Sequence, residues 1–538
     1  MLLAVLRNRR IAAIEAAYLG FTLAEWVQWI GMLVYAFNVG GATGVGIAVL
    51  VQLAPAAVVA PLAAVLGDRY RRDRMLVLAY LLQGAAIIAL AAAIGAHLPV
   101  APVYALAALA NAAMTLTRPL QAALIPALAE TPAELTAANV TAGLIQNVSL
   151  LAGPGLAGLG LAVGGIAPVF AVFGGLVVGS GVLVFLAVAR APRPAGTVSA
   201  VRVHPIVALA EGFGALLRSG RPRPVASLFA VSEVVWGAMD VLVVVLALDR
   251  LALDDSAVGF LGAVIGAGGL AGVALTVMLI GRPRLAVPYG IGAVFFGLPL
   301  AFLGASASLL ITVLLLLVAG AGHSVMNVAG LTLLQRVAPH AMLARIFGAL
   351  EGINMASLAV GSMAASLAVE ALGSQSAFVL AGLLLPVAVL LATRSLREID
   401  MASEVHLVEI ELLRGIPIFA PLSALVLERL AASLIPAHVE AGDEIIRQGD
   451  IGDRYYVLAE GRVTVMIDGV PARELGPGEG FGEIALLRDV PRTASVVALG
   501  EVELLALERL PFLEVVTGFP QSGAAAESVI AGRLSPAG

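Results

Sequence analysis

The sequence predicts two fold classes in one chain: an all-α membrane domain of 12 transmembrane helices in two six-helix halves, then a C-terminal β-roll with flanking helices. The 538 residues are 60% hydrophobic and 12% charged, with a mean hydropathy of +1.01, far above a soluble domain. Residues 401–538 nevertheless hold 20 of the 36 acidic residues and only 10 of the 31 basic ones. That last part also carries short apolar runs separated by glycines, which is typical of antiparallel strands.

Twelve segments of the first 395 residues are apolar and long enough to cross a bilayer, since a spanning helix needs roughly 20 apolar residues. A longer polar break divides them six and six, and part of it (204–219) fits either a helix on the membrane surface or a loose linker. The expected spans are 11–38, 42–66, 74–96, 101–128, 134–164, 167–190, 223–250, 256–281, 284–304, 307–336, 341–371 and 374–394. The expected domains are an N-terminal six-helix half (1–190), a linker (191–222), a C-terminal six-helix half (223–395), a linker (396–404) and the soluble domain (405–538).

Arginine placement predicts the orientation. Arginines gather before the first span, in the loop 67–74, in the central linker and in the loops near residues 282, 336 and 394, whereas the opposite loops carry Arg250 and little else. By the positive-inside rule, both termini, the central linker and the soluble domain are cytoplasmic. We expect a multi-pass protein of a bacterial-type plasma (inner) membrane.

Several classes of chemistry are not expected. The chain has no cysteine, which excludes disulfides and thiol catalysis. No hydrolase constellation, Walker loop or cluster of metal ligands stands out in the sequence. We therefore predict no enzyme, no catalytic residue, no metal, no covalent cofactor and no nucleic-acid partner, and expect an ion gradient to drive any transport.

Three local motifs lie in register with the spans: GDRYRRDR (67–74) after the second, TRPLQAAL (117–124) in the fourth and GPGLAG (153–158) in the fifth. With the six-plus-six division, they resemble motifs A, B and C of the major facilitator superfamily over the first 395 residues or so. Positions 64, 71 and 122 depart from the pattern, because they hold Ala64, Arg71 and Ala122 where glycines are common.

The motif A resemblance implies a conformational latch made of Asp68, Arg69 and Arg72, because a carboxylate accepts charge-assisted hydrogen bonds from guanidinium groups. The alternative is that these arginines only fix the topology. The motif C resemblance implies a bend often seen in antiporters, and close packing of small residues explains the same glycines.

Charged residues inside spans point to a transport pathway, because a charge in the membrane is costly and usually faces a cavity or a partner. Glu25 and Asp240 lie about halfway along the first and seventh spans, which are counterparts in the two halves. We predict that they carry protons or contact substrate, with Arg118 as an ion-pair partner of one of them. Glu233 is either a residue of this pathway or an interfacial residue. Trp26 and Trp29 are either packing residues or substrate contacts.

The soluble domain is expected to begin with helices over 405–416 and 417–439, to continue as a β-roll, and to close with helices over 508–516 and 522–534. Within the roll, FGEIALLRDVPRTASV (481–496) has the chemistry of a phosphate site. A short helix starts just after Gly482, so that free backbone amides face an anion. Arg492 returns to the same point as a bidentate phosphate donor, while Glu483 is free to bind a sugar hydroxyl.

These residues resemble the phosphate-binding cassette of the cyclic nucleotide-binding domains of catabolite activator proteins, protein kinase regulatory subunits and cyclic nucleotide-gated channels, over about 405–535. The resemblance implies that Glu483 binds the ribose 2′-hydroxyl, and that Arg492 and the amides of Ile484 and Ala485 bind the phosphate. Thr493 then lies near the phosphate or the base, and Val529, Ile530 or Leu534 covers the base. The implied regulatory ligand is cAMP or cGMP, and the alternative is a roll that binds nothing.

The expected function is a transporter driven by an ion gradient, with the proton as the favoured ion and export of an unknown small molecule as the favoured direction, regulated by the cyclic nucleotide. Two alternatives remain: a membrane receptor for the cyclic nucleotide that does not transport, and a transporter of the cyclic nucleotide itself. The expected partners are the nucleotide, the lipid bilayer and the transported molecule. The sequence leaves the oligomeric state open, with a homodimer among the alternatives.

Overall fold

The computed structural model describes residues 8–69, 71–128, 132–188, 214, 222–276, 284–305, 308–337, 343–402, 407–423, 426–427, 430–431 and 433–534. It divides into two compact units, Met1–Ala402 and Ser403–Gly538. The segment 204–219, which was expected as either a surface helix or a loose linker, lies outside the described residues except for residue 214, as does nearly all of the rest of the central linker.

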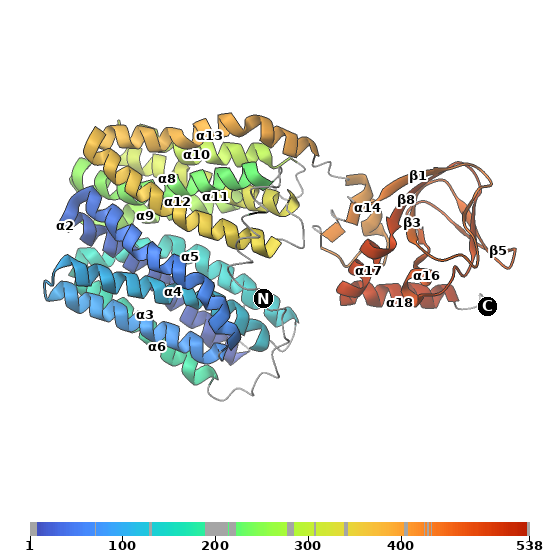
Figure 1. The fold of residues 1–538 in the computed structure, drawn as a ribbon, viewed down its shortest axis with the longest axis horizontal. Helices are drawn as coiled ribbons and strands as arrows, with labels where there is room; N and C mark the ends of the chain where they lie inside the picture. The colour runs from blue at the N-terminus through green and yellow to red at the C-terminus, as the bar shows by residue number, and fades with distance from the viewer. Residues whose placement is uncertain are drawn as a thin grey trace. The chain divides into compact units, whose positions relative to one another are not determined.

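The first unit is helical and consists of two groups of helices, blue to cyan and green to orange in Figure 1. The first group contains α2 (Arg9–Arg69), α3 (Arg72–Gly95), α4 (Val100–Leu128), α5 (Pro132–Gly164) and α6 (Ile166–Val188). The second contains α8 (Pro222–Val245), the π-helix η1 (Leu246–Arg250), α9 (Ser256–Thr276), α10 (Ala286–Leu303), α11 (Leu309–Val337), α12 (Leu343–Leu372) and α13 (Ser374–Ala402).

Helix α2 contains a kink that divides it into two segments. Gly40 and Gly41 have non-helical backbone angles, and Gly41 has a φ of 58°, which glycine adopts readily. The kink falls between the expected spans 11–38 and 42–66. Among the described residues, 11 helices are long and apolar enough to cross a membrane when α2 is counted once. The expected total of 12 spans stays a prediction.

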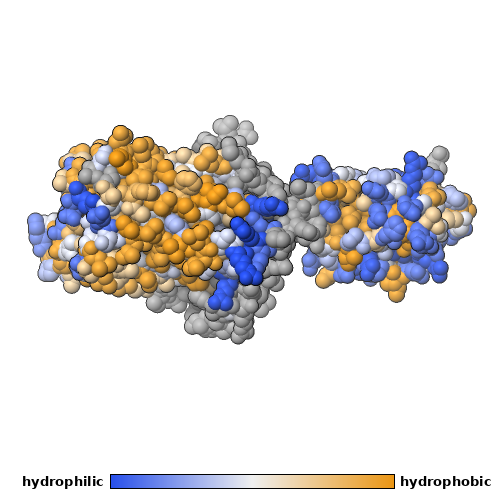
Figure 2. All heavy atoms as spheres, turned by 90° about the horizontal axis from the view of Figure 1, so that it is seen from above, coloured by the Kyte–Doolittle hydropathy of each residue, from blue (hydrophilic) through white to orange (hydrophobic). Residues whose placement is uncertain are grey.

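The surface of this unit suits a lipid environment. Figure 2 shows an apolar belt across it, with hydrophilic residues gathered toward its two ends. Large aliphatic side chains stand exposed on several helices, including Val163 at 83%, Leu310 at 68% and Leu391 at 82%. An apolar surface of this extent is unusual on a soluble monomer and matches a membrane-spanning protein.

The two groups of helices pack on each other through α5 with α9 and α2 with α12. A Cβ atom built on Gly259 of α9 would lie 2.3 Å from the backbone nitrogen of Gly158, the last residue of GPGLAG. Only glycine permits so close an approach. Close packing of small residues, one of the two explanations for GPGLAG, therefore has a structural basis.

Polar contacts tie the two groups together near the middle of α2. Asn38 donates to the carboxylate of Asp255 at 3.0 and 3.2 Å, and Ser366 Oγ donates to the carbonyl of Ala42 at 2.8 Å.

Helix α13 continues to Ala402 and so occupies most of the segment expected as a linker at 396–404. Leu396 and Ile399 are 4% and 3% exposed, because they pack in the core of the unit. Asp400 Oδ1 accepts hydrogen bonds from the amides of Leu285 and Ala286 at 3.1 and 3.0 Å, which caps the start of α10. These contacts extend the helix past its apolar stretch.

The second unit is a β-roll with helices around it (Figure 1). Its two antiparallel sheets have the strand orders β1-β8-β3-β6 and β2-β7-β4-β5. The strands are β1 (Ile435–Val439), β2 (Glu444–Ile446), β3 (Arg454–Glu460), β4 (Val463–Ile467), β5 (Val470–Leu475), β6 (Gly480–Phe481), β7 (Ser495–Ala498) and β8 (Val502–Glu508). The helices are α14 (Leu407–Gly415), α16 (Glu483–Arg488), α17 (Arg509–Gly518) and α18 (Pro520–Leu534).

One sequence expectation for this unit was wrong. Residues 435–439 were expected to end a helical stretch, but they form the edge strand β1, paired with Val502–Ala506 of β8. Pro436 cannot supply a helical hydrogen bond, whereas an edge strand tolerates proline. Pairing with a strand more than 60 residues away decided the conformation, and a local pattern does not carry that information.

Candidate functional site

The stretch FGEIALL forms a sharp turn between a strand and a helix. Strand β6 pairs with β3, Gly482 follows with a φ of 97°, and α16 begins at Glu483. A Cβ on residue 482 would lie 2.7 Å from Nη1 of Arg492 and 3.1 Å from the carbonyl oxygen of Arg454. Both the left-handed backbone and the close approach of the guanidinium therefore require glycine here.

Arg492 lies under this turn, 5% exposed. Its Nη1 donates to the carbonyl of Gly482 at 3.0 Å, and its Nη2 donates to the carbonyl of Arg454 at 2.7 Å and approaches Asp453 Oδ1 at 3.5 Å. Burial lowers the pKa of the guanidinium, while the neighbouring Tyr456 and Asp453 oppose that shift. The structure thus holds a buried cation whose two short hydrogen bonds go to backbone carbonyls, with Asp453 as a longer ion-pair partner at 3.5 Å.

Glu483 is 1% exposed at the start of α16 and makes a bidentate ion pair. Nη1 of Arg533, in the last turn of α18, lies 2.7 Å from each of its carboxylate oxygens. Nη2 of Arg533 donates to the carbonyl of Gly480 at 2.6 Å. The final helix of the chain is therefore bonded directly to the turn that precedes α16.

The other predicted residues lie around the same turn. The amides of Ile484 and Ala485 belong to the first turn of α16, where backbone N–H groups have no partner within the helix. Ala485 is 2% exposed, whereas Thr493 is exposed. The structure thus places four of the predicted residues, Gly482, Glu483, Ile484 and Ala485, in the turn next to Arg492, and Thr493 directly after Arg492.

Arg533 is the residue that the sequence analysis missed. Val529, Ile530 or Leu534 was expected to cover the base, but Ile530 is 1% exposed in the core of the unit, and Val529 packs against the same core. The side chain of Leu534 lies outside the described residues. The available signal was a single arginine near the end of an Ala-rich helix, which local pattern reasoning does not connect to a carboxylate 50 residues earlier.

In the first unit, a cavity of about 560 Å³ lies between the two groups of helices. Its volume is within the range of roughly 300–1,000 Å³ that is usual for small-molecule sites. Residues of α2, α4, α8, α11 and α12 line it. The polar residues of this lining are Glu25, Asn111, Thr115, Arg118, Glu233, Asp240, Asn327, Glu351 and Asn354. All three predicted transport residues therefore face one space.

Arg118 pairs with Glu25 and not with Asp240. Its Nη2 lies 2.9 and 2.7 Å from the two carboxylate oxygens of Glu25, and Tyr18 also hydrogen-bonds to it. The Arg118 side chain is 50% exposed and that of Glu25 is 16% exposed, so the pair borders the cavity rather than the core. This pair joins α2 to α4 within one half.

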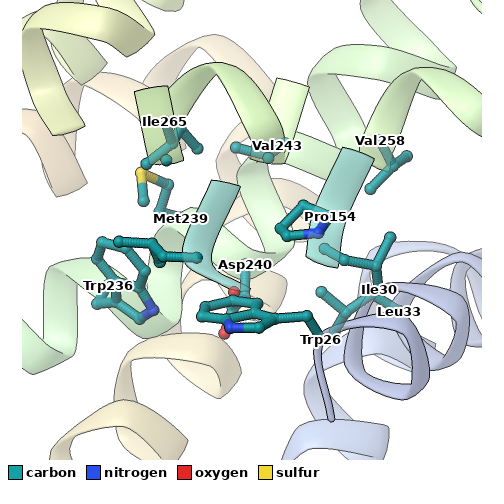
Figure 3. Close-up of a pocket in the computed structure, with 13 residues that line it drawn as sticks. Trp26, Ile30, Leu33, Pro154, Trp236, Met239, Asp240, Val243, Val258 and Ile265 are labelled. Carbon is teal, nitrogen blue, oxygen red and sulfur yellow. The ribbon is translucent and has the colours of Figure 1, made fainter. Parts of the chain in front are cut away.

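Asp240 has a different environment. The Trp29 side chain hydrogen-bonds to its carboxylate, and Oδ2 is buried with no hydrogen-bond partner among the described residues. Asp240 also lines a second, narrower space of about 40 Å³ next to the main cavity. Figure 3 shows this side chamber, with Trp26 and Trp236 beside Asp240 and apolar side chains such as Pro154 around the rest.

Two further lining residues were not predicted as site residues. Glu233 was left open between the transport pathway and the membrane interface, and Trp236 was not singled out, yet both line the main cavity with Asp240. The three positions are separated by three and four residues, so they share one face of α8. That spacing was a usable signal in the sequence.

The predicted latch is only partly visible. Asp68 and Arg69 end α2, and their side chains lie outside the described residues. Arg72 begins α3, and the neighbouring Arg71 makes an ion pair with Asp73 at 2.6 Å. The latch therefore stays a prediction. Among the residues that the structure describes, no group of His, Cys, Asp or Glu has the arrangement of a metal site.

Comparison with known families gives two matches. A family model described as the Major Facilitator Superfamily matches residues 16–348. A second, described as the cyclic nucleotide-binding domain, matches residues 436–518. The first match covers most of the unit with the central cavity and ends near the start of α12, and the second covers the turn at Gly482 together with Arg492.

The similar proteins each match only a part of this chain. The cAMP-dependent protein kinase regulatory subunit of Dictyostelium discoideum is 43% identical over 91 residues, 15% of this chain and 28% of that protein. A cyclic nucleotide-gated potassium channel of Rhizobium etli is 39% identical over 111 residues, 21% of this chain and 31% of the channel. The solved structure of the Thermus thermophilus catabolite activator protein is 32% identical, with a TM-score of 0.21, over 22% of this chain and 58% of that chain. The chain spans less than a third of the two curated relatives.

Proposed function

The chain belongs to the Major Facilitator Superfamily, and we propose that it is a transporter driven by an ion gradient whose activity is regulated by cAMP or cGMP bound at its C-terminal unit. The observation that carries the regulatory part is the position of two buried and oppositely charged groups at one turn. Glu483 directly follows Gly482, and Arg492 donates a hydrogen bond to the carbonyl of Gly482. A cyclic nucleotide offers a phosphate to the guanidinium and a ribose hydroxyl to the carboxylate.

The chemistry of this turn supports the assignment in detail. Arg492 bonds mainly to carbonyl oxygens, so a phosphate is a stronger acceptor than its present partners. The amides of Ile484 and Ala485 add donors at the same point, and Thr493 supplies an exposed hydroxyl after Arg492. The cyclic nucleotide names carried by the relatives agree with this ligand class.

The central cavity supports transport over a receptor without transport. A cavity of about 560 Å³ with charged residues from both halves is costly to maintain in a membrane unless it serves a solute. Asp240 is the proposed proton carrier because one of its oxygens is buried without a hydrogen-bond partner among the described residues. Glu25 with Arg118 is the proposed second coupling site, where proton uptake would break the ion pair.

The same lining argues against the cyclic nucleotide as the transported molecule. Four carboxyl groups and one guanidinium line the cavity, so it repels an anionic phosphodiester. The second unit offers the anion a site of its own. We therefore place the nucleotide in the regulatory unit, which the positive-inside rule puts in the cytoplasm of a cell with this protein in its plasma membrane. Export of a cytoplasmic solute in exchange for protons fits this orientation.

The direct test compares metabolites inside and outside cells that express the wild-type protein, Asp240→Asn or Arg492→Ala. Wild type is expected to lower the cell content of a defined set of compounds, and Asp240→Asn is expected to abolish that change. Arg492→Ala is expected to keep transport but to lose its response when cellular cAMP or cGMP is raised.

Glu15→Gln is the matched control, because Glu15 is a buried carboxyl group of α2 that does not line the cavity. Metabolites that do not differ between wild type and Asp240→Asn would contradict transport. An identical nucleotide response in wild type and Arg492→Ala would contradict the regulatory site.

A further inference from the structure

We propose that the central cavity binds an organic cation with aromatic or alkyl groups. This inference rests on the proposed transport function, because it names the class of molecule that the same cavity takes. Three features of the cavity carry it: its excess of carboxyl groups, its tryptophans and its apolar side chamber.

The first feature is the charge of the lining. Arg118 is already paired with Glu25, which leaves Glu233, Asp240 and Glu351. Among the described residues, none of these three carboxyl groups takes part in an ion pair. An apolar surrounding strengthens their attraction for a cation, since the effective dielectric constant there is far below that of water. A cationic solute therefore supplies the missing charge.

The second feature is aromatic. The chain has three tryptophans, and all three line this cavity: Trp26 and Trp29 from α2 and Trp236 from α8. Indole faces attract cations more strongly than other aromatic side chains do, and sites for quaternary ammonium ions use them. Asp240 brings these features together, because it is a carboxyl group of the cavity lining and the Trp29 side chain hydrogen-bonds to it.

The third feature is the side chamber drawn in Figure 3. It shares Trp26, Trp236 and Asp240 with the main cavity, and its remaining lining is apolar, including Ile30 and Met239. At about 40 Å³ it accommodates a small apolar substituent beside the carboxylate. A strongly hydrated metal ion would gain nothing from this chamber, whereas a cation that carries hydrocarbon groups fits both spaces.

The test is a binding titration on the purified full-length protein, with tetraphenylphosphonium as the cation and tetraphenylborate as an anion of matched size and shape. Tryptophan fluorescence reports on the cavity directly, because every tryptophan of the chain lines it. We expect saturable quenching by the cation and at least tenfold weaker binding of the anion. Equal or tighter binding of tetraphenylborate would overturn the proposal.

Variants assign the binding to the carboxyl groups. Asp240→Asn and Glu351→Gln are each expected to weaken tetraphenylphosphonium binding about tenfold, and Glu15→Gln is expected to leave it unchanged. Isothermal titration calorimetry on each variant, after size-exclusion chromatography shows a monodisperse peak, gives the affinities. If both cavity variants bind like wild type, the cation site is wrong.

This experiment separates the two proposals. If the cavity variants lose cation binding, but the metabolites of cells with wild type and with Asp240→Asn do not differ, the cation site stands and the transport function is wrong. Transport of neutral or anionic metabolites in cells, without cation binding by the purified protein, would keep the transport function and remove this inference.

Discussion

Arg533, near the end of the last described helix, forms an ion pair with the carboxylate of Glu483, in which one guanidinium nitrogen lies 2.7 Å from both carboxylate oxygens. The same side chain donates to the carbonyl of Gly480 at 2.6 Å. In the proposed function, a ribose hydroxyl needs that carboxylate. A ligand that binds at the turn therefore competes with Arg533 of α18 for the carboxylate of Glu483. Ligand binding and the contact between α18 and Glu483 are thus coupled.

Replacement of Arg533 tests that competition. Arg533→Gln is expected to raise the affinity for cAMP or cGMP about tenfold or more, because the ligand no longer displaces a charged contact that contributes about 1.5–3 kcal/mol. Calorimetry on the full-length protein measures it. Arg447→Gln is the control, because Arg447 pairs with the nearby Glu444 and not with a residue of α18. A lower affinity in Arg533→Gln would mean that Arg533 contacts the ligand itself.

Loss of the buried guanidinium should have the opposite effect. Arg492→Ala is expected to weaken nucleotide binding at least tenfold, since a hydrogen bond to a charged group contributes about 1.5–3 kcal/mol. The matched control is Arg447→Ala, which removes an arginine that is 70% exposed and pairs with Glu444. Unchanged affinity in Arg492→Ala would remove the site assignment.

The turn at Gly482 gives a prediction about backbone conformation. Gly482→Ala places a Cβ in a left-handed residue, at a cost of about 1–2 kcal/mol, and brings it 2.7 Å from Arg492 Nη1. We expect at least a tenfold loss of nucleotide affinity by equilibrium dialysis. Gly476→Ala should bind normally, because nothing lies within 4 Å of its added Cβ. Normal binding by Gly482→Ala would show that the turn does not need glycine.

A cross-strand pair in the roll gives a pH dependence. His438 Nδ1 lies 2.7 Å from Glu503, its partner across β1 and β8, and this contact raises the pKa of the imidazole. The stabilisation is complete below the ordinary histidine pKa of about 6.5 and is lost as the pH rises through the raised pKa. NMR of labelled histidine in the full-length protein should show a higher pKa for His438 in the wild type than in the Glu503→Gln variant. Equal titration curves would exclude the contact.

The expected topology can be read with reporters. A reporter fused after Gly538 and one inserted near Pro194 should both report the cytoplasm, and one near His97 should report the outside. The reason is the gathering of arginines in the loops of one side. One reversed reporter would contradict the twelve-span orientation. As a control, each reporter fusion should keep the activity of the untagged protein, which shows that the insertion has not damaged the fold.

Much of the fold was predictable because it depends on local patterns. The apolar segments gave the long helices, and the glycines of the roll mark its turns, as at Gly482 with its φ of 97°. The edge strand β1 was missed because it is a strand only by pairing with β8. The end of α13 was missed because Leu396, Ile399 and Asp400 extend the helix through contacts with the core and with α10.

The sequence by itself determined the membrane unit, the soluble unit and the short motif that holds Glu483 and Arg492, since hydropathy, helical period and turn glycines act over neighbouring residues. Only the tertiary structure decided which distant side chains meet. Arg118 pairs with Glu25 rather than Asp240, and Arg533 reaches Glu483 across 50 residues. Such pairs depend on how helices and sheets pack, where displacement by a single helical turn exchanges one partner for another.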